Sequence, residues 1–278
     1  MASITYFRNK DWFDIFPYVF GGAVMIYMVL PILIIVPMSF SEAQYFQFPP
    51  RSFSFKWYIN FFTDRYWRGS MILSLQVALI TTILATFLGT LAAFGLDRGQ
   101  FRGKSLIQGI VLSPRIIPFI ITALAAYFFY ARLKLIGTRF ALITIHTVLA
   151  TPFVVISLSA ALKGFDRALE RAAMGLGASR LQTYLRVTLP VVRPGIISGA
   201  VLAFMTSFDE VIIAIYICGT SSVTLPKQMW DGMIREIEPT ITAVASLLVG
   251  VTILLLILTG MLGKKSTPAK GSKTPTIS

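Results

Sequence analysis

The sequence of 278 residues has a single cysteine, a single histidine and few charged residues of either sign. One cysteine excludes a disulfide bond within the chain, so we interpret Cys218 as a small apolar residue. The lone histidine, His146, has no second ligand at a useful spacing, which favours a packed or hydrogen-bonded core residue over a metal ligand. Charged residues amount to 13%, where soluble proteins average about 25%. These scarcities argue against a secreted disulfide scaffold, a metal centre and an ordinary soluble domain.

Catalytic motifs are equally scarce. The nearest approach to a phosphate-binding loop is GQFRGKS at residues 99–105, which has three residues between its glycines where the motif requires four. It also follows a long apolar segment, whereas the motif follows a β-strand. We therefore interpret it as a basic turn, and we expect this chain to be no enzyme and to bind no cofactor by itself.

Apolar residues, by contrast, make up 55% of the chain, and the mean hydropathy is +0.74. Six segments approach the ~20 apolar residues that span a bilayer: 16–40, 70–96, 106–130, 139–162, 196–218 and 241–262. The third and fourth contain Pro114, Pro118 and Pro152, which helices tolerate in a membrane only where neighbours or water satisfy the disturbed backbone. The first segment is long and has no clear cleavage site, so we expect it to stay as an anchor. We predict an all-α integral membrane protein with one membrane domain over residues 16–262.

The basic residues indicate an orientation. Six spans put both ends of the chain on one side, and the positive-inside rule selects that side. Most of the 25 Lys and Arg residues face inward if residues 1–15 and 263–278 are cytoplasmic. The net charge of +13 then reflects membrane orientation and requires no nucleic acid partner. The tail 263–278 is mostly Ser, Thr, Pro and Lys, so we expect it to be disordered.

Two segments on the outer side of this arrangement are expected to contain short helices. Residues 53–67 are rich in aromatic side chains, which is typical of a helix at the headgroup level of a membrane. Residues 225–238, LPKQMWDGMIREIE, are compatible with a second short helix at the outer mouth of the bundle.

The longest polar interval in the second half, residues 164–195, lies between the fourth and fifth apolar segments and is strongly basic. Asp166 can cap a short helix over residues 166–176. Gly175 and Gly177 follow its small apolar face and are expected to stop it, Gly177 through a turn with positive φ. The sequence therefore predicts a first short helix at the cytoplasmic surface.

A second helix is predicted directly after this turn. Ser179 and Gln182 fit a capping box, in which each side chain satisfies a free backbone N–H. Apolar residues then recur at helical spacing, and Pro190 and Pro194 are expected to end the helix. Together the two helices form a predicted helix-turn-helix at the membrane surface. A DNA-reading role is disfavoured, because such a motif would hardly lie between membrane spans.

This interval resembles the EAA loop of the permease subunits of bacterial ABC importers, whose pattern is Glu-Ala-Ala, three residues, Gly, nine residues, Ile, one residue, Leu-Pro. The positions that match are Ala172, Ala173, Gly177, Val187, Leu189 and Pro190. Two positions depart from the pattern. The Glu of the pattern falls on Arg171, with the acidic residue one place earlier at Glu170, and the Asp often found two residues before the Gly is Gly175. The departures concern a polar contact, whereas the Gly177 turn is retained.

The resemblance implies a six-helix type I importer permease of a bacterial inner membrane, with a coupling loop at residues 163–195 between spans 4 and 5. It also implies partners: a second homologous permease, two cytoplasmic ATPase subunits that bind ATP and Mg, an extracytoplasmic solute-binding protein, and membrane lipid. A groove of the ATPase would receive the helix 166–176, carrying rigid-body motion to the bundle. By this resemblance, the residues that contact the ATPase are Glu170, Arg171, Ala172, Ala173, Gly177 and Arg180.

Charged residues within the predicted spans indicate where a solute passes. At 1.5 Å per residue, Arg115 lies ~14 Å into the third span and Asp209 ~20 Å into the fifth, both near the midplane. Charges there are costly and should face the interior of the bundle or a water-filled path. One interpretation is an internal ion pair of Arg115 with Asp209 or Glu210. The other is a cation-attracting carboxylate pair on a solute path, with aromatic faces from Phe204, Phe208 and Tyr216.

Further segments, SFDEVIIAIYICG, TLPKQMW and IEPTITAVASLL, extend the resemblance over most of residues 70–262, towards the permeases of the spermidine/putrescine branch. That branch implies a polyamine or a related amine as solute. Arg115 would repel a simple polycation unless it is neutralised, so a zwitterionic or carboxylate-bearing amine, or an organophosphonate, is an alternative. A secondary transporter would be expected to show an internal repeat, and none is evident. A membrane-anchored scaffold would leave the midplane charges unexplained.

Overall fold

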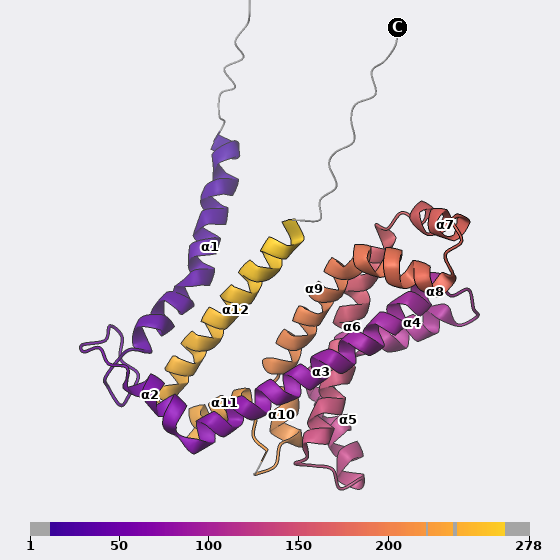
Figure 1. Cartoon of the computed structure of the whole chain (residues 1–278). Coiled ribbons are helices and arrows are strands. Elements are labelled where there is room, and N and C mark those ends of the chain that lie inside the picture. The colour runs from indigo at the N-terminus through magenta and orange to yellow at the C-terminus, as the bar shows by residue number, and fades with distance from the viewer. Residues whose placement is uncertain (1–11, 221, 236–237, 265–278) are drawn as a thin grey trace, which may run out of the picture. The chain divides into compact units, whose positions relative to one another are not determined.

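The computed structural model describes residues 12–220, 222–235 and 238–264, and every regular element in these ranges is a helix (Figure 1). In chain order the elements are α1 (Trp12–Met38), α2 (Lys56–Thr63), α3 (Arg65–Arg98), α4 (Lys104–Leu112), η1 (Ser113–Arg115), α5 (Phe119–Arg132), α6 (Arg139–Lys163), α7 (Ala168–Gly175), α8 (Arg180–Thr183), η2 (Tyr184–Thr188), α9 (Leu189–Phe208), α10 (Ile212–Ile217), α11 (Leu225–Arg235) and α12 (Thr240–Lys264). The predicted all-α class is confirmed. Residues 1–11 and the tail from residue 265, predicted to be disordered, lie outside the described ranges.

Several of these helices are suited to a bilayer. Four are long and apolar enough to cross it: α1, α3, α6 and the helix that runs from Arg180 to Phe208 through α8, η2 and α9. The pair of α4 with η1 and α5 passes the same test only together, as a bent pair. The apolar helix Thr240–Leu254, the described apolar part of α12, is shorter. The structure thus supports a multi-pass protein, whereas six spans remain a prediction.

The predicted span over residues 106–130 is broken into two helices. α4 and η1 end at Arg115, α5 begins at Phe119, and the two parts are bent by 99°. Proline has no backbone N–H, and it also disfavours helical backbone at the residue before it. Pro114 and Pro118 flank the bend, so they account for its position. The consequence is a short stretch of irregular backbone, residues 116–118, inside a predicted span.

The chain divides into two compact units, residues 1–63 with 236–251 and residues 64–235 with 252–278. In the first unit, α2 is joined to the end of α1 by a 2.7 Å hydrogen bond between Ser39 Oγ and Tyr58 OH. Asn60 Nδ2 donates to Thr240 Oγ1 at 2.9 Å, which joins α2 to the start of α12. A helix within residues 53–67 is therefore confirmed, and its seat at the headgroup level remains a prediction.

In the second unit, α3, α6 and α9 pack closely through small residues. A Cβ atom added to Gly89 of α3 would lie 2.7 Å from Val154 Cβ of α6, and one added to Gly199 of α9 would lie 2.9 Å from Val154 Cα. One buried alanine from each helix completes this contact: Ala85, Ala150 and Ala203. Small residues allow membrane helices to approach where lipid supplies no hydrophobic driving force. These three helices form the rigid part from which the candidate sites extend.

The remaining helices of this unit are fastened to that core. α5 and α10 share a buried apolar cluster with α3 and α6. The backbone N–H of Leu225, at the start of α11, donates to Ser74 Oγ of α3 at 2.7 Å. The predicted helix at residues 225–238 is confirmed as α11 up to Arg235.

Candidate functional site

The loop between α6 and α9 begins with the short helix α7. Asp166 Oδ1 accepts a 2.8 Å hydrogen bond from the backbone N–H of Ala168, the first residue of α7, although the N-cap position itself is Arg167, which makes no side-chain cap bond. Gly177 has φ +89°, so the predicted left-handed turn after the helix is confirmed. No residue of α7 is buried, and Leu176 beside the turn is 90% exposed. The tip of the loop is therefore an open surface.

The capping box at the start of α8 is also confirmed. Gln182 N–H donates to Ser179 Oγ at 3.2 Å, and Ser179 N–H donates to Gln182 Oε1 at 2.9 Å. The expectation that Pro190 and Pro194 end this helix is wrong, because it continues to Phe208. Pro190 lies just after the π-helical turn η2, so the helix changes its hydrogen-bond pattern at this proline and does not end there. The tip of the loop is thereby continuous with a membrane helix.

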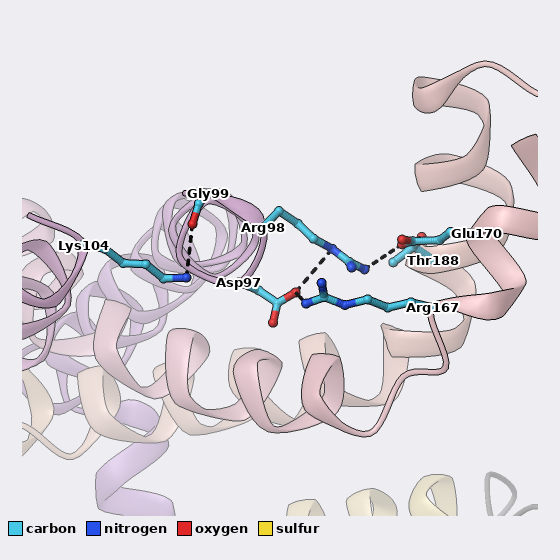
Figure 2. Close-up of polar contacts among 7 residues, drawn as sticks. All are labelled: Asp97, Arg98, Gly99, Lys104, Arg167, Glu170 and Thr188. Atoms are coloured by element: carbon cyan, nitrogen blue, oxygen red, sulfur yellow. Dashed lines mark hydrogen bonds and ion pairs between the residues drawn. The ribbon is translucent and has the colours of Figure 1, made fainter. Parts of the chain in front are cut away.

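A network of five polar side chains ties α7 to the end of α3 and to η2 (Figure 2). Arg98 Nη2 donates to Glu170 Oε1 at 2.7 Å, and Arg98 Nε lies 3.3 Å from Asp97 Oδ2. Arg167 Nη2 donates to the same Asp97 oxygen at 3.1 Å. Thr188 Oγ1 donates to Glu170 Oε1 at 2.6 Å. We call Asp97, Arg98, Arg167, Glu170 and Thr188 the α7 latch.

The latch is partly withdrawn from solvent. The side chains of Asp97, Arg98 and Glu170 are 16%, 17% and 13% exposed, whereas that of Arg167 is 55% exposed. Charge-assisted hydrogen bonds are strong in such surroundings, and a charge left there without its partner is costly. The latch therefore holds α7 in a fixed place relative to α3 and η2.

The Glu170 carboxylate accepts hydrogen bonds within the chain, and the predicted contact of Glu170 with an ATPase stays a prediction. Arg171 and Arg180 are exposed, as is Ala172, and Ala173 is partly exposed. Their contacts with an ATPase remain predictions. The sequence reasoning missed Asp97, Arg98, Arg167 and Thr188 as partners of Glu170. A usable signal was present for two of them, because an Asp-Arg pair directly after a long apolar segment invites a partner of opposite charge.

A second candidate site lies where α9 ends. The expected single helix over residues 196–218 is wrong: α9 stops at Phe208 and α10 begins at Ile212. Glu210, 8% exposed, accepts at Oε2 from the backbone N–H groups of Ile213 at 2.8 Å and Ala214 at 3.3 Å. Asp209 is exposed, and within the described ranges its carboxylate has no hydrogen bond or ion pair. The two adjacent carboxylates therefore differ, because one holds the start of α10 and the other is free.

Asp209 and Glu210 line a hollow of about 410 Å³, together with Phe119 of α5 and Phe153 of α6. The guanidinium carbon of Arg115 lies 4.7 Å from the centre of the Phe153 ring. No ion pair joins Arg115 to Asp209 or Glu210 in the part of the chain that the structure describes. The break at residues 209–211 lines this hollow, and Phe119 directly follows the break at residues 116–118. Irregular backbone at membrane depth is tolerated where it lines a cavity.

The aromatic residues of this hollow are not the expected ones. Phe208 stacks on Phe204 with ring centres 5.5 Å apart, and Tyr216 packs against the apolar cluster of α3, α5 and α6. Neither lines the hollow, whereas Phe119 and Phe153 do. Both of these follow a proline directly, which was the available signal, although their distance in sequence hid their proximity.

His146 is buried and its Nδ1 lies 2.9 Å from Ser207 Oγ, which confirms the interpretation of a hydrogen-bonded core residue. Among the described residues no group of three or more His, Cys, Asp or Glu side chains could hold a metal ion.

Comparisons with known proteins agree on a family. Residues 85–267 match the family described as binding-protein-dependent transport system inner membrane component. The putrescine transport system permease protein PotI of Escherichia coli K12 is 32% identical over 231 residues, which cover 81% of this chain and 82% of that protein. The spermidine/putrescine transport system permease protein PotC of Haemophilus influenzae is 28% identical over 247 residues, covering 89% and 96%.

Solved structures resemble the fold. A bacterial ABC transporter involved in the import of the acidic polysaccharide alginate gives a TM-score of 0.68 at 18% identity, over 94% of this chain and 99% of that chain. The MetNI methionine ABC transporter in an inward-facing conformation gives 0.57 at 23% identity, over 72% and 95%. Since the family match extends over well more than half of the sequence, this chain belongs to the binding-protein-dependent transport system inner membrane components, the permease family of ABC transporters.

Proposed function

We propose that this chain is the permease subunit of an ATP-driven importer, and that its loop at residues 163–195 receives the motion of an ATPase. The observation that supports this most directly is α7, an exposed helix on a fixed base. A docking element for a moving partner requires both properties: an open face to bind, and a rigid attachment through which force reaches the bundle. The α7 latch and the Gly177 turn provide them.

The proposed assembly contains a second homologous permease, two cytoplasmic ATPase subunits and an extracytoplasmic solute-binding protein. ATP and Mg would bind at the ATPase subunits, and this chain would bind neither. Membrane lipid surrounds the spans, and nucleic acid has no part. The chain ends are proposed to be cytoplasmic, which puts α7 on the same side as the ATPases.

A continuous helix connects the loop at residues 163–195 to the hollow beside Asp209, and it suggests how motion of the ATPases reaches the solute. The helix from Arg180 to Phe208 begins at the tip of the loop and ends at the break beside Asp209. Thr188 of η2 bonds Glu170, so α7 and this helix are joined near the tip. When the ATPases close, a displacement of α7 would shift the helix as one body and alter the hollow at its other end.

The solute that this hollow fits is a polyamine. The Asp209 carboxylate attracts an ammonium group, and the rings of Phe119 and Phe153 offer it aromatic faces. The relatives PotI and PotC, named for putrescine and spermidine/putrescine transport, support this choice. Arg115 beside Phe153 favours a second candidate, a zwitterionic or carboxylate-bearing amine or an organophosphonate, whose negative group would face the guanidinium.

The function is tested with the complete assembly in proteoliposomes. Labelled putrescine should accumulate only when ATP is inside with the ATPases and the binding protein with solute is outside. The binding protein should also raise the rate of ATP hydrolysis. Accumulation without the ATPases, driven by an ion gradient, would instead identify a secondary transporter. A preference for a zwitterionic amine in the same assay would select the second candidate.

Orientation is tested by cysteine labelling in a Cys218→Ala background. Ser179 is exposed at the tip, and Thr220 is exposed beyond α10, whereas Ser222 is buried and unsuited to labelling. A membrane-impermeant maleimide should label Ser179→Cys only from the cytoplasmic side and Thr220→Cys only from the outside. Labelling of both from one side would contradict the proposed orientation.

A further inference from the structure

A groove at the ends of α3, α4 and α6 takes no part in the function proposed above. Its volume is about 460 Å³, and it combines apolar residues with polar ones. Its apolar lining includes Leu112 of α4 with Val155 and Ile156 of α6, and its polar lining includes Lys104, Gln108 and Lys163. All three helices belong to the same compact unit, residues 64–235 with 252–278.

The mouth of the groove is basic. Lys104 is the first residue of α4 and Lys163 the last residue of α6. Lys104 Nζ donates to the Gly99 carbonyl at 3.2 Å and keeps its remaining protons (Figure 2). Lys163 is exposed, and within the described ranges its ammonium has no ion pair. Asp97 also lines the groove, but Arg98 and Arg167 neutralise its carboxylate, so the two lysines dominate the charge.

The floor becomes apolar with depth. Along α4, Leu112 lies ~12 Å from Lys104, and along α6, Ile156 lies ~10 Å from Lys163, at 1.5 Å per helical residue. No residue of α4 is buried within the chain, so its apolar face is open to a ligand. The groove therefore has two lysines at its mouth, the amide of Gln108 next to them, and an apolar wall further along, long enough to contact part of an acyl chain.

We propose that this groove binds one anionic phospholipid, with its phosphate held by Lys104 and Lys163 and an acyl chain along Leu112, Val155 and Ile156. A free phosphate would leave the apolar wall without a contact, and both lysines would repel a cationic amine. Basic residues at the ends of membrane helices attract the anionic lipids of the cytoplasmic leaflet. Lys104 and Lys163 stand at the end of the helices that the positive-inside rule assigns to that leaflet. Asp97 belongs to both the groove wall and the α7 latch, so the lipid would brace the base of the latch.

The test compares lipid binding by the complete purified assembly, after delipidation, by native mass spectrometry. Phosphatidylglycerol and phosphatidylcholine with identical acyl chains are added separately, so that only the headgroup charge differs. The wild type should bind the first lipid more tightly. Lys163→Gln should lower this preference about 5-fold, and Lys104→Gln with Lys163→Gln about 30-fold, since each basic residue near an anionic surface contributes about the same increment. Lys163→Gln alone is informative if the double variant fails to assemble.

Arg102→Gln is the matched control, because Arg102 is exposed in the adjacent turn, carries the same charge and does not line the groove. It should retain the wild-type preference. The proposal is overturned if the lysine variants keep the preference, or if Arg102→Gln loses it equally, which would indicate a diffuse charge effect. It is also overturned if water-soluble glycerol phosphate competes as well as the lipid, or if the lipid binds the isolated chain and leaves when the second permease joins.

Discussion

The α7 latch and the hollow beside Asp209 lie near opposite ends of the helix from Arg180 to Phe208, and their charged residues differ in how they are paired. In the α7 latch, each acidic residue contacts a basic one, at distances of 2.7 to 3.3 Å. At the hollow, Asp209 has no polar partner among the described residues, and Arg115 lies over the ring of Phe153, which lines the hollow. Charges that are already satisfied fix a structure, whereas charges left free are available to a ligand. The α7 latch therefore has the features of a rigid connection between helices, and the hollow has those of a binding site.

The acidic residues Glu170, Glu210 and Asp209 also differ in whether their carboxylates are already bonded within the chain. Glu170 accepts from Arg98 and Thr188, and Glu210 accepts from two backbone N–H groups of α10. Both are structural within this chain. Asp209, next to Glu210, faces the hollow instead. The predicted carboxylate pair thus separates into one structural residue and one candidate for solute contact.

The largest effect is expected at the latch. Glu170→Gln removes the negative charge to which Arg98 and Thr188 both donate, while Arg98 keeps Asp97, and weakening these two charge-assisted hydrogen bonds costs about 3 kcal/mol. The free energy of unfolding in mixed micelles should fall by that amount, and stimulation of the ATPase by the binding protein should be lost with it. Adding Arg98→Met should restore part of the stability, since the charges of Arg98 and Glu170 then leave together and Asp97 keeps Arg167.

Asp166→Asn is the control for this variant, because it changes an acidic residue of the same loop that contacts a backbone N–H and no basic side chain. It should lower stability by about 1 kcal/mol or less. If Glu170→Gln is as mild as this control, the latch does not hold α7.

The second prediction compares the two adjacent carboxylates. Glu210→Ala leaves the N–H groups of Ile213 and Ala214 without an acceptor and should cost about 2 kcal/mol of stability. Asp209→Asn should change stability by less than about 0.5 kcal/mol, since it breaks no contact. Uptake of a dicationic solute should nevertheless fall about 10-fold, the equivalent of one lost charge-assisted contact. Equal stability losses in the two variants would contradict the assigned roles.

Local signals in the sequence were sufficient for the tip. The bond of Asp166 to the first N–H of α7, the capping box of Ser179 with Gln182 and the turn at Gly177 each depend on residues within a few positions, so they were predicted correctly. The predicted effect of the prolines on helix ends was wrong. The helix from Arg180 to Phe208 continues through Pro190, whereas Pro114 and Pro118 flank a 99° bend. Proline alone does not distinguish these outcomes, because tertiary packing decides between them.

Long-range contacts were not predictable from one sequence. Arg98 and Glu170 are 72 positions apart, and nothing in their neighbourhoods pairs them. Phe153 reaches the hollow only because α6 packs against α9, a contact made by small residues such as Gly199. The charges that the sequence places near the midplane include Asp209, which lines the hollow. Their separation into a free Asp209 and a capping Glu210 depends on where α9 ends, and helix ends are weakly encoded locally.

A smaller effect is expected at the turn. Gly177→Ala places a Cβ atom at φ +89°, which costs about 1 kcal/mol although no described residue other than its chain neighbours lies within 4 Å of that atom. Gly175→Ala, two residues earlier and without positive φ, is the control and should be neutral or slightly stabilising. Membrane insertion should be unaffected in both, and only Gly177→Ala should weaken coupling between ATP hydrolysis and uptake. Equal coupling in the two variants would show that the left-handed turn is dispensable.

The smallest expected effect is the most informative about the hollow. If Arg115 and Asp209 formed an ion pair, the cycle of Arg115→Met and Asp209→Asn would give a coupling free energy of about 1 to 3 kcal/mol in stability, as expected for Arg98 with Glu170. Because Arg115 instead lies over Phe153, that coupling should be below about 0.5 kcal/mol.

The rate of uptake should distinguish the two candidate solutes. Arg115→Met should leave uptake of a polyamine unchanged and should lower uptake of a zwitterionic amine, whose negative group needs the guanidinium. The cycle must be repeated with Glu210→Gln, since that carboxylate borders the same hollow. A large coupling free energy in stability, with uptake fully recovered in the charge-free double variant, would mean that Arg115 and Asp209 form a structural ion pair like those of the α7 latch. The solute would then pass elsewhere.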